Sequence, residues 1–162
     1  MSEARLRLLA SEGTLWAVLD ACVSADVPAR VELRGPEGGD CLWKGASRER
    51  YWEVAPWLAN VDLGLFDWIR ANLWDAPFGV FVEARATLDA LRGHFRRIQV
   101  VEVPGGRRMV LRFYDTRVLP AYLGSATAEE RAELFGPLSA FFTLSGEPGA
   151  RLLSTFRKED RR

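Results

Sequence analysis

His94 is the only histidine of the chain, and Cys22 and Cys41 are its only cysteines, so few residues are available for nucleophilic or metal chemistry. A zinc site normally needs three or four Cys, His or acidic ligands, and these three residues show no recognisable metal spacing. No nucleophile elbow or orienting motif accompanies His94. We therefore expect no catalytic residue, metal or cofactor here, two reduced thiols, and a His94 that lies exposed or partly packed on a helix.

Four carboxylates stand at or near the ends of expected strands and helices, where the paired acids of glycosidases can stand: Glu53, Glu83, Glu102 and Asp115. Nothing in their spacing singles out one pair. Carboxylates at such positions more often cap a helix or pair with arginine. We therefore do not expect an enzyme.

Charge is divided unevenly along the chain, although 22 basic and 22 acidic residues give a formal net charge of zero. Residues 53–83 hold five acids against one arginine, a net −4, and residues 87–117 hold seven arginines against three acids, a net +4. The favoured interpretation is that these solvated faces pair with each other, and an acidic protein partner is the second. Nucleic acid is disfavoured, because few aromatic residues lie among the arginines to stack on bases.

All six tryptophans fall within the first 74 residues. Tryptophan is enriched at interfaces because it offers a large contact area with little rotamer entropy. We expect Trp16, on an apolar segment, to belong to the core. Trp52 and Trp57, which flank the Pro56 break, and Trp74, at the end of a helix, are the candidates for a partner-binding surface.

Length and composition are those of one ordinary globular domain, with 162 residues of which 48% are hydrophobic. We expect strands and helices to interleave in a single α/β (α+β) lobe with a mixed sheet and one antiparallel hairpin. The expected strands are 14–20, 41–44, 78–83 and 140–144, with the hairpin at 98–103 and 109–114 around Pro104. The expected helices lie before Gly13, from Leu65 to before Pro77, at 87–98 after an N-cap at Thr87, and from a capping box at Thr127 to Gly136. Residues 26–45 are expected to be rich in loops, and residues 51–58 to be extended before a short helical turn.

No run of about 18 apolar residues is present to span a bilayer, and the N-terminus lacks a signal-peptide core. We therefore expect a cytoplasmic protein that does not insert in a membrane. Residues 1–156 are expected to form the domain, and residues 157–162 a charged, disordered tail.

Six segments over about residues 14–144 carry a family resemblance: Leu15-Trp-Ala-Val-Leu-Asp20, Val54-Ala-Pro-Trp-Leu58, Phe78-Gly-Val-Phe-Val82, Leu88 to Arg96 with Leu91, His94 and Phe95, Leu111-Arg-Phe-Tyr-Asp-Thr-Arg-Val-Leu119, and Phe135-Gly-Pro137. Together they resemble a family of bacterial type VI secretion adaptors, also called effector chaperones, defined by a domain long labelled as of unknown function. The Arg-Phe-Tyr-Asp-x-Arg-Val element at 112–118 is the most specific segment.

This element also has a physical interpretation of its own. We expect Asp115 to close a strand and cap the following turn, with either Arg112 or Arg117 as its ionic partner. The element would then join the hairpin to the next helix, which is a structural role.

The resemblance implies binding without catalysis. Such adaptors hold a specific toxin effector and deliver it to the VgrG spike protein while remaining in the cytoplasm of the producing cell. Many members continue into a second helical lobe, so we expect these 162 residues to form one sheet-and-helix lobe only. The alternative is a small anion- or ligand-binding domain, or an enzyme, that uses Asp115 with the Arg107–Arg117 cluster, and a basic-face nucleic-acid binder is a third hypothesis.

Overall fold

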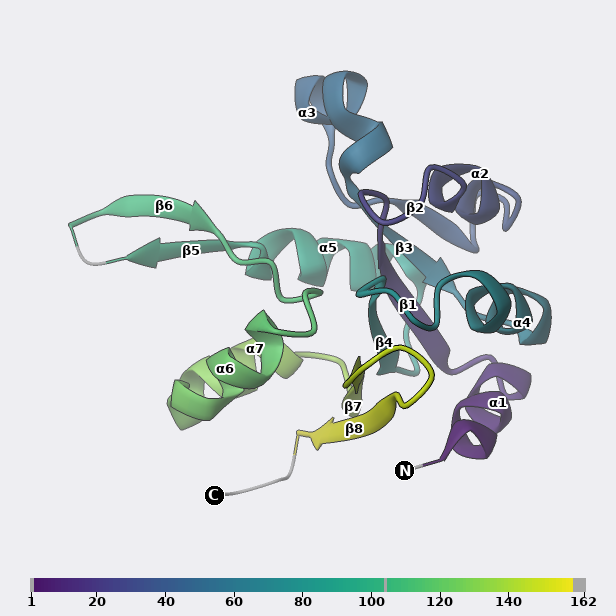
Figure 1. The fold of residues 1–162 in the computed structure, drawn as a ribbon. Coiled ribbons are helices and arrows are strands. Elements are labelled where there is room, and N and C mark those ends of the chain that lie inside the picture. The colour runs from purple at the N-terminus through teal and green to yellow at the C-terminus, as the bar shows by residue number, and fades with distance from the viewer. Residues whose placement is uncertain (1, 104, 159–162) are drawn as a thin grey trace.

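A six-stranded antiparallel sheet runs through the middle of the molecule (Figure 1). The computed structural model describes residues 2–103 and 105–158. From one edge to the other, the sheet consists of β2 (Gly39–Cys41), β3 (Pro56–Asn60), β1 (Leu15–Asp20), β4 (Gly79–Glu83), β7 (Ala140–Ser145) and β8 (Leu152–Arg157). A separate hairpin of β5 (Val100–Val103) and β6 (Arg107–Val110) projects from the body of the domain.

Strand β1 lies in the interior of the sheet, and all six of its residues are buried. Because alternate side chains of a strand point to opposite faces, β1 supplies two cores. Leu15, Ala17 and Leu19 enter one core, whereas Trp16 and Val18 enter the other. An apolar run without alternation is typical of such a strand, so the predicted buried strand at 14–20 is confirmed.

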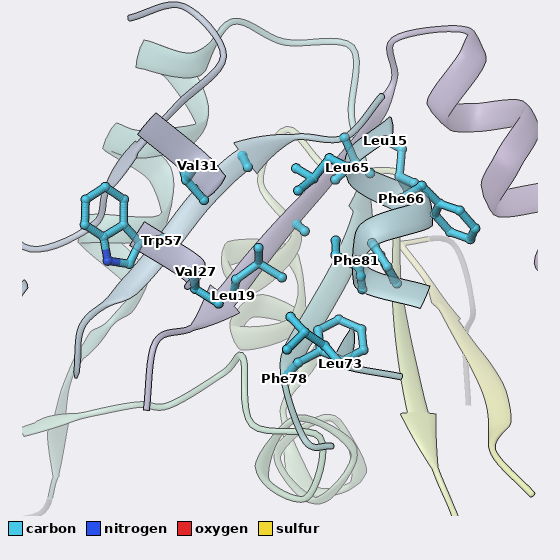
Figure 2. Packing of buried hydrophobic residues seen from close by; sticks show 14 of the residues in the cluster. Leu15, Leu19, Val27, Val31, Trp57, Leu65, Phe66, Leu73, Phe78 and Phe81 are labelled. Atoms are coloured by element: carbon cyan, nitrogen blue, oxygen red, sulfur yellow. The ribbon is translucent and has the colours of Figure 1, made fainter. Parts of the chain in front are cut away.

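Helices cover both faces of this sheet (Figure 1). The first core lies under α1 (Glu3–Ser11), α2 (Val27–Glu32) and α4 (Leu63–Asn72), and Figure 2 shows part of it. The second core lies under α5 (Leu88–Ile98), α6 (Val118–Ser125) and α7 (Ala128–Phe135). The short helix α3 (Gly45–Tyr51) buries none of its residues and stands away from the sheet.

The predicted helix boundaries with a clear capping signal are confirmed. The hydroxyl of Thr87 accepts a hydrogen bond from the Ala90 amide at 3.3 Å. At α7, Thr127 and Glu130 form the predicted capping box, in which each side chain accepts from the other residue's amide. Gly136 then ends α7 with φ +47°, a conformation that favours glycine.

The single α+β lobe is as predicted, but the sheet is not mixed. Every paired neighbour among the described strands is antiparallel. The alternation of strands and helices suggested that some neighbouring strands would be parallel. In this fold, each strand instead runs opposite to the strands beside it. The final strand, β8, was also missed, because its partly exposed edge position allows polar residues such as Ser154 and Thr155.

Two predicted segments need correction. Residues 26–45 contain α2 as well as loops, and the short strand lies at Gly39–Cys41 rather than at 41–44. Over residues 51–58 the order is reversed: the end of α3 and a 3-10 turn, Trp52–Val54, come before β3. Pro56 is tolerated because it is the first residue of that strand.

The ends of two further segments also differ from expectation. Strand β6 ends at Val110, so Asp115 follows a loop and does not close a strand. Arg157 belongs to β8, and Lys158 donates a hydrogen bond to the Gly136 carbonyl at 2.7 Å. Pro104 and residues 159–162 of the predicted tail lie outside the described residues.

Two glycines provide a test of this packing. Gly79 has φ +136°, and a Cβ there would overlap the carbonyl oxygen of Val18 in the neighbouring strand. We predict that Gly79→Ala lowers the free energy of unfolding by about 3 kcal/mol in urea titrations. Gly93 lies on α5 with nothing within 4 Å of a Cβ. The matched Gly93→Ala should instead raise stability by about 0.5–1 kcal/mol, and equal effects of the two changes would contradict this packing.

Candidate partner-binding site

An apolar groove of about 480 Å³ lies between α3 and the base of the β5–β6 hairpin. These two elements project from the sheet (Figure 1). The groove is lined by Leu42, Trp43, Lys44, Ser47, Tyr51, Arg96, Gln99, Val100 and Val110. This lining includes two cationic side chains and no carboxylate. The depression lined by these nine residues is called the groove below.

Arg96, on α5, holds the floor of the groove in place. Its Nε donates to the Leu42 carbonyl at 2.8 Å, and its Nη2 donates to the Cys41 carbonyl at 3.0 Å. Leu42 and Cys41 stand where the chain leaves the edge strand β2. Burial lowers the pKa of Arg96, but a guanidinium remains charged in proteins. A fixed cation therefore lies beside the apolar floor.

A cluster around Asp40 fixes α3, one wall of the groove, relative to α5. The Asp40 carboxylate, on β2, accepts from Arg48 Nη1 at 2.8 Å and from Arg92 Nη1 at 2.6 Å, and Arg96 Nη2 lies 3.8 Å away. Arg48 belongs to α3, whereas Arg92 and Arg96 belong to α5. The carboxylate thus joins α3 to α5 through β2. Arg92 also pairs with Asp89, so three guanidinium groups meet two carboxylates and this region keeps a net positive charge.

Several large apolar side chains on the two walls are open to solvent. Tyr51 is 45% exposed on α3, and Val100 and Val110 are 47% and 61% exposed at the hairpin base. Such residues gathered around one depression are typical of an interaction site, whereas single exposed apolar residues are ordinary.

Gln99 is the polar residue in the groove with unmet hydrogen-bonding capacity. It is only 6% exposed, and its Nε2 is buried with no partner among the described residues. A buried amide without a partner costs free energy, which an acceptor brought by a ligand would recover.

The structure does not bring the three predicted tryptophans into one surface. Trp57 is 1% exposed and packs in the core near Val31 (Figure 2), so its assignment to a surface was wrong. Trp74 is half-buried, with its ring against those of Phe66 and Phe81. Trp52 is exposed, but it lies one residue beyond the groove residue Tyr51 and is not part of the lining.

Trp43 and Tyr51 are the aromatic residues that the groove uses. Their rings meet edge to face, with centroids 6.5 Å apart. Neither was singled out from the sequence, because Trp43 was assigned to a strand and Tyr51 to an extended segment. The only available signal was the concentration of tryptophans in the first half of the chain.

The Arg-Phe-Tyr-Asp-x-Arg-Val element has a structural role. Asp115 accepts from the Arg117 amide at 2.9 Å and from Arg117 Nη2 at 2.8 Å, and these hydrogen bonds hold the pKa of Asp115 below its ordinary value. Arg117 is thus the partner of Asp115. Arg112 instead donates to Asp20 Oδ2 at 2.6 Å and ties the element to the end of β1. Because these arginines serve two different carboxylates, the contacts do not support one anion site built from Asp115 and the Arg107–Arg117 cluster.

His94 is buried at 2% exposure, which corrects the expectation of an exposed or partly packed residue. Its Nε2 lies 2.9 Å from the Leu134 carbonyl, and Arg97 Nη2 lies 3.4 Å from Nδ1. These contacts fit a neutral imidazole that donates from Nε2 and accepts at Nδ1. His94 therefore joins α5 to α7.

A comparison with protein families identifies the class of this chain. Residues 15–133 match the family described as Domain of unknown function (DUF4123). The match covers more than half of the chain, so the chain belongs to this family. No curated protein and no solved structure matches it. In the described residues, no helix is long and apolar enough to cross a membrane.

His94 gives a pH test of this arrangement. Burial, together with nearby Arg97, lowers the pKa of His94 below 6.5. The unfolded chain then binds a proton more readily than the folded one, so stability should fall as pH decreases below about 6.5. We predict that NMR titration of this single imidazole gives a pKa below 6.5. His94→Gln, which cannot titrate, should show a smaller loss of stability between pH 7 and 5.5, whereas an imidazole that titrates above 6.5 would contradict the prediction.

Proposed function

We propose that this protein is a cytoplasmic adaptor that binds a toxin effector of type VI secretion and helps to load it onto the VgrG spike. The groove between α3 and the β5–β6 hairpin is the observation that carries the proposal. An adaptor works through an exposed surface that recognises a protein segment. The resemblance of residues 14–144 to effector adaptors supplies the class of partner.

The groove has the properties expected of a protein-binding site. Its lining includes two aromatic rings, those of Trp43 and Tyr51, and tryptophan and tyrosine are the residues enriched where binding energy concentrates. The ion pairs around Asp40 hold the α3 wall in position before a partner arrives. A wall that is already ordered loses little conformational entropy on binding, which favours affinity.

Co-purification tests the proposed function directly. The full chain should retain the toxin and the spike protein encoded beside it when the proteins are mixed at micromolar concentration. Size-exclusion chromatography with light scattering would give the stoichiometry. A folded chain that retains neither protein would refute the adaptor function.

Truncation of Tyr51 tests whether the groove is the effector site. We predict that Tyr51→Ala weakens effector binding at least tenfold in isothermal titration calorimetry, because an aromatic anchor is lost from the groove wall. The variant should fold normally, since α3 buries none of its residues. Leu33→Ala is the matched control: Leu33 is 77% exposed and lies outside the groove lining. Equal affinities of the two variants would place the effector on another surface.

A further inference from the structure

We infer that the segment held in the groove is an acidic peptide segment, whose apolar side chains contact the groove floor and whose carboxylates meet a basic rim. The inference deepens the proposed function and rests on it for the statement that this segment belongs to an effector. The chemistry of the segment is argued from the groove alone.

The rim of the groove carries positive charge that the chain itself does not neutralise. Lys44 and Arg96 are part of the lining, which contains no carboxylate. Arg108 lies on the same face of the hairpin as Val110, because Val100 pairs with Val110 and Glu102 pairs with Arg108 in the β5–β6 register. Glu102, the single acid on the hairpin strands, lies opposite Arg108 on this face, so the face itself is not negative.

Lys44 and Arg108 differ from many basic residues of this chain in having no ionic partner. Among the described residues, no carboxylate lies within 4 Å of either side chain, whereas elsewhere carboxylates meet arginines in close ion pairs: Arg34 with Asp62, Arg112 with Asp20, and Arg117 with Asp115. Lys44 thus stands beside the apolar groove without an ionic partner among the described residues, and Arg108 faces only Glu102 across the hairpin. The Asp40 cluster adds to this field, because three arginines there meet only two carboxylates, Asp40 and the Asp89 that also pairs with Arg92.

The floor of the groove is apolar, so positive charge alone does not account for what binds there. Val100 and Val110 present aliphatic surface above the buried Leu42, and the partly exposed rings of Trp43 and Tyr51 extend it. Contact with this surface requires apolar side chains on the partner. The unpartnered amide of Gln99 requires an acceptor, which a main-chain carbonyl or a carboxylate of the segment would supply.

These requirements favour a peptide over the other occupants. A second copy of the same groove would place like charges against each other, which is unfavourable. Single-stranded nucleic acid would satisfy the cations, but bases stack on open aromatic faces, and here the aliphatic Leu42, Val100 and Val110 form much of the lining. An acidic segment with leucine or phenylalanine side chains meets the cations and the apolar floor together.

Three synthetic peptides of twelve residues test the inference without an effector. The first combines Asp and Glu with Leu and Phe, the second replaces the apolar residues with Ser, and the third replaces the acids with Lys. Each is titrated into the isotopically labelled full chain and followed by NMR. The first peptide should shift the amides of Trp43, Tyr51, Gln99 and Val110 and bind at least tenfold more tightly than the other two. Its affinity should fall severalfold from 50 to 300 mM salt, because screening weakens exposed charge pairs.

Charge reversal supplies the matched variants. Lys44→Glu and Arg108→Glu should each weaken binding of the first peptide at least fivefold. Arg85→Glu makes the same change in net charge and should leave affinity within twofold. Arg85 is exposed and has no carboxylate partner among the described residues. Arg85 lies before the first residue of α5, and the groove residue Gln99 lies after its last. The length of that helix, about 16 Å at 1.5 Å per residue, therefore separates Arg85 from Gln99.

Several results would overturn the inference. The inference fails if the first peptide does not bind, or if the serine peptide binds as tightly as the first. It fails likewise if the lysine peptide or a single-stranded oligonucleotide binds more tightly than the first peptide. An Arg85→Glu variant that weakens binding as much as Lys44→Glu and Arg108→Glu would also refute it. Failure of the inference can be separated from failure of the proposed function. An effector retained equally by the native chain and by Lys44→Glu and Arg108→Glu would leave the adaptor function standing and refute the acidic segment. Binding of the first peptide without retention of the effector would support the acidic segment and refute the adaptor function.

Discussion

Burial of β1 on both faces is the constraint on which the rest of the domain depends. A strand without a solvent-facing side needs a helical layer above and below it and a strand on each side for its backbone hydrogen bonds. Strands β3 and β4 provide the hydrogen bonds, and the helices of the two cores provide the layers. The groove lies at the β2 side of this arrangement, where α3 and the hairpin extend beyond the covered sheet.

Carboxylates join these outlying parts to the sheet. Asp20 at the end of β1 binds Arg112, and Asp40 on β2 binds Arg48 and Arg92. Both carboxylates are largely buried and are contacted by guanidinium groups from other segments of the chain. They therefore constrain the positions of these segments more strongly than an exposed ion pair does. The zero net charge of the chain therefore conceals an uneven distribution, in which Arg112, Arg48 and Arg92 pair with carboxylates that position elements, whereas Lys44 beside the groove has no such partner among the described residues.

Local signals predicted those elements whose determinants lie within a few residues. The continuous apolar run of β1, the N-cap at Thr87, the capping box at Thr127 and the terminating Gly136 all appear where expected. Prediction failed where distant contacts decide the outcome. Residues 51–54 are helical and Pro56 begins β3, the reverse of the expected order, because the Pro56 carbonyl accepts from the Leu42 amide and the strand pairs with β1 on its other side. Strand β8 exists because β7 offers it a free edge.

For the site, the sequence by itself determined a family resemblance, an uneven charge distribution and the concentration of all tryptophans in the first half of the chain. Only the tertiary structure decided which of these residues face solvent. Trp57 is buried and Tyr51 is exposed, although both come from the same short segment. The groove joins residues 42–51 to residues 96–110, and contacts over that separation depend on how α5 and the hairpin pack against β2. No local propensity encodes such packing, since it follows from the shape and burial of the whole sheet.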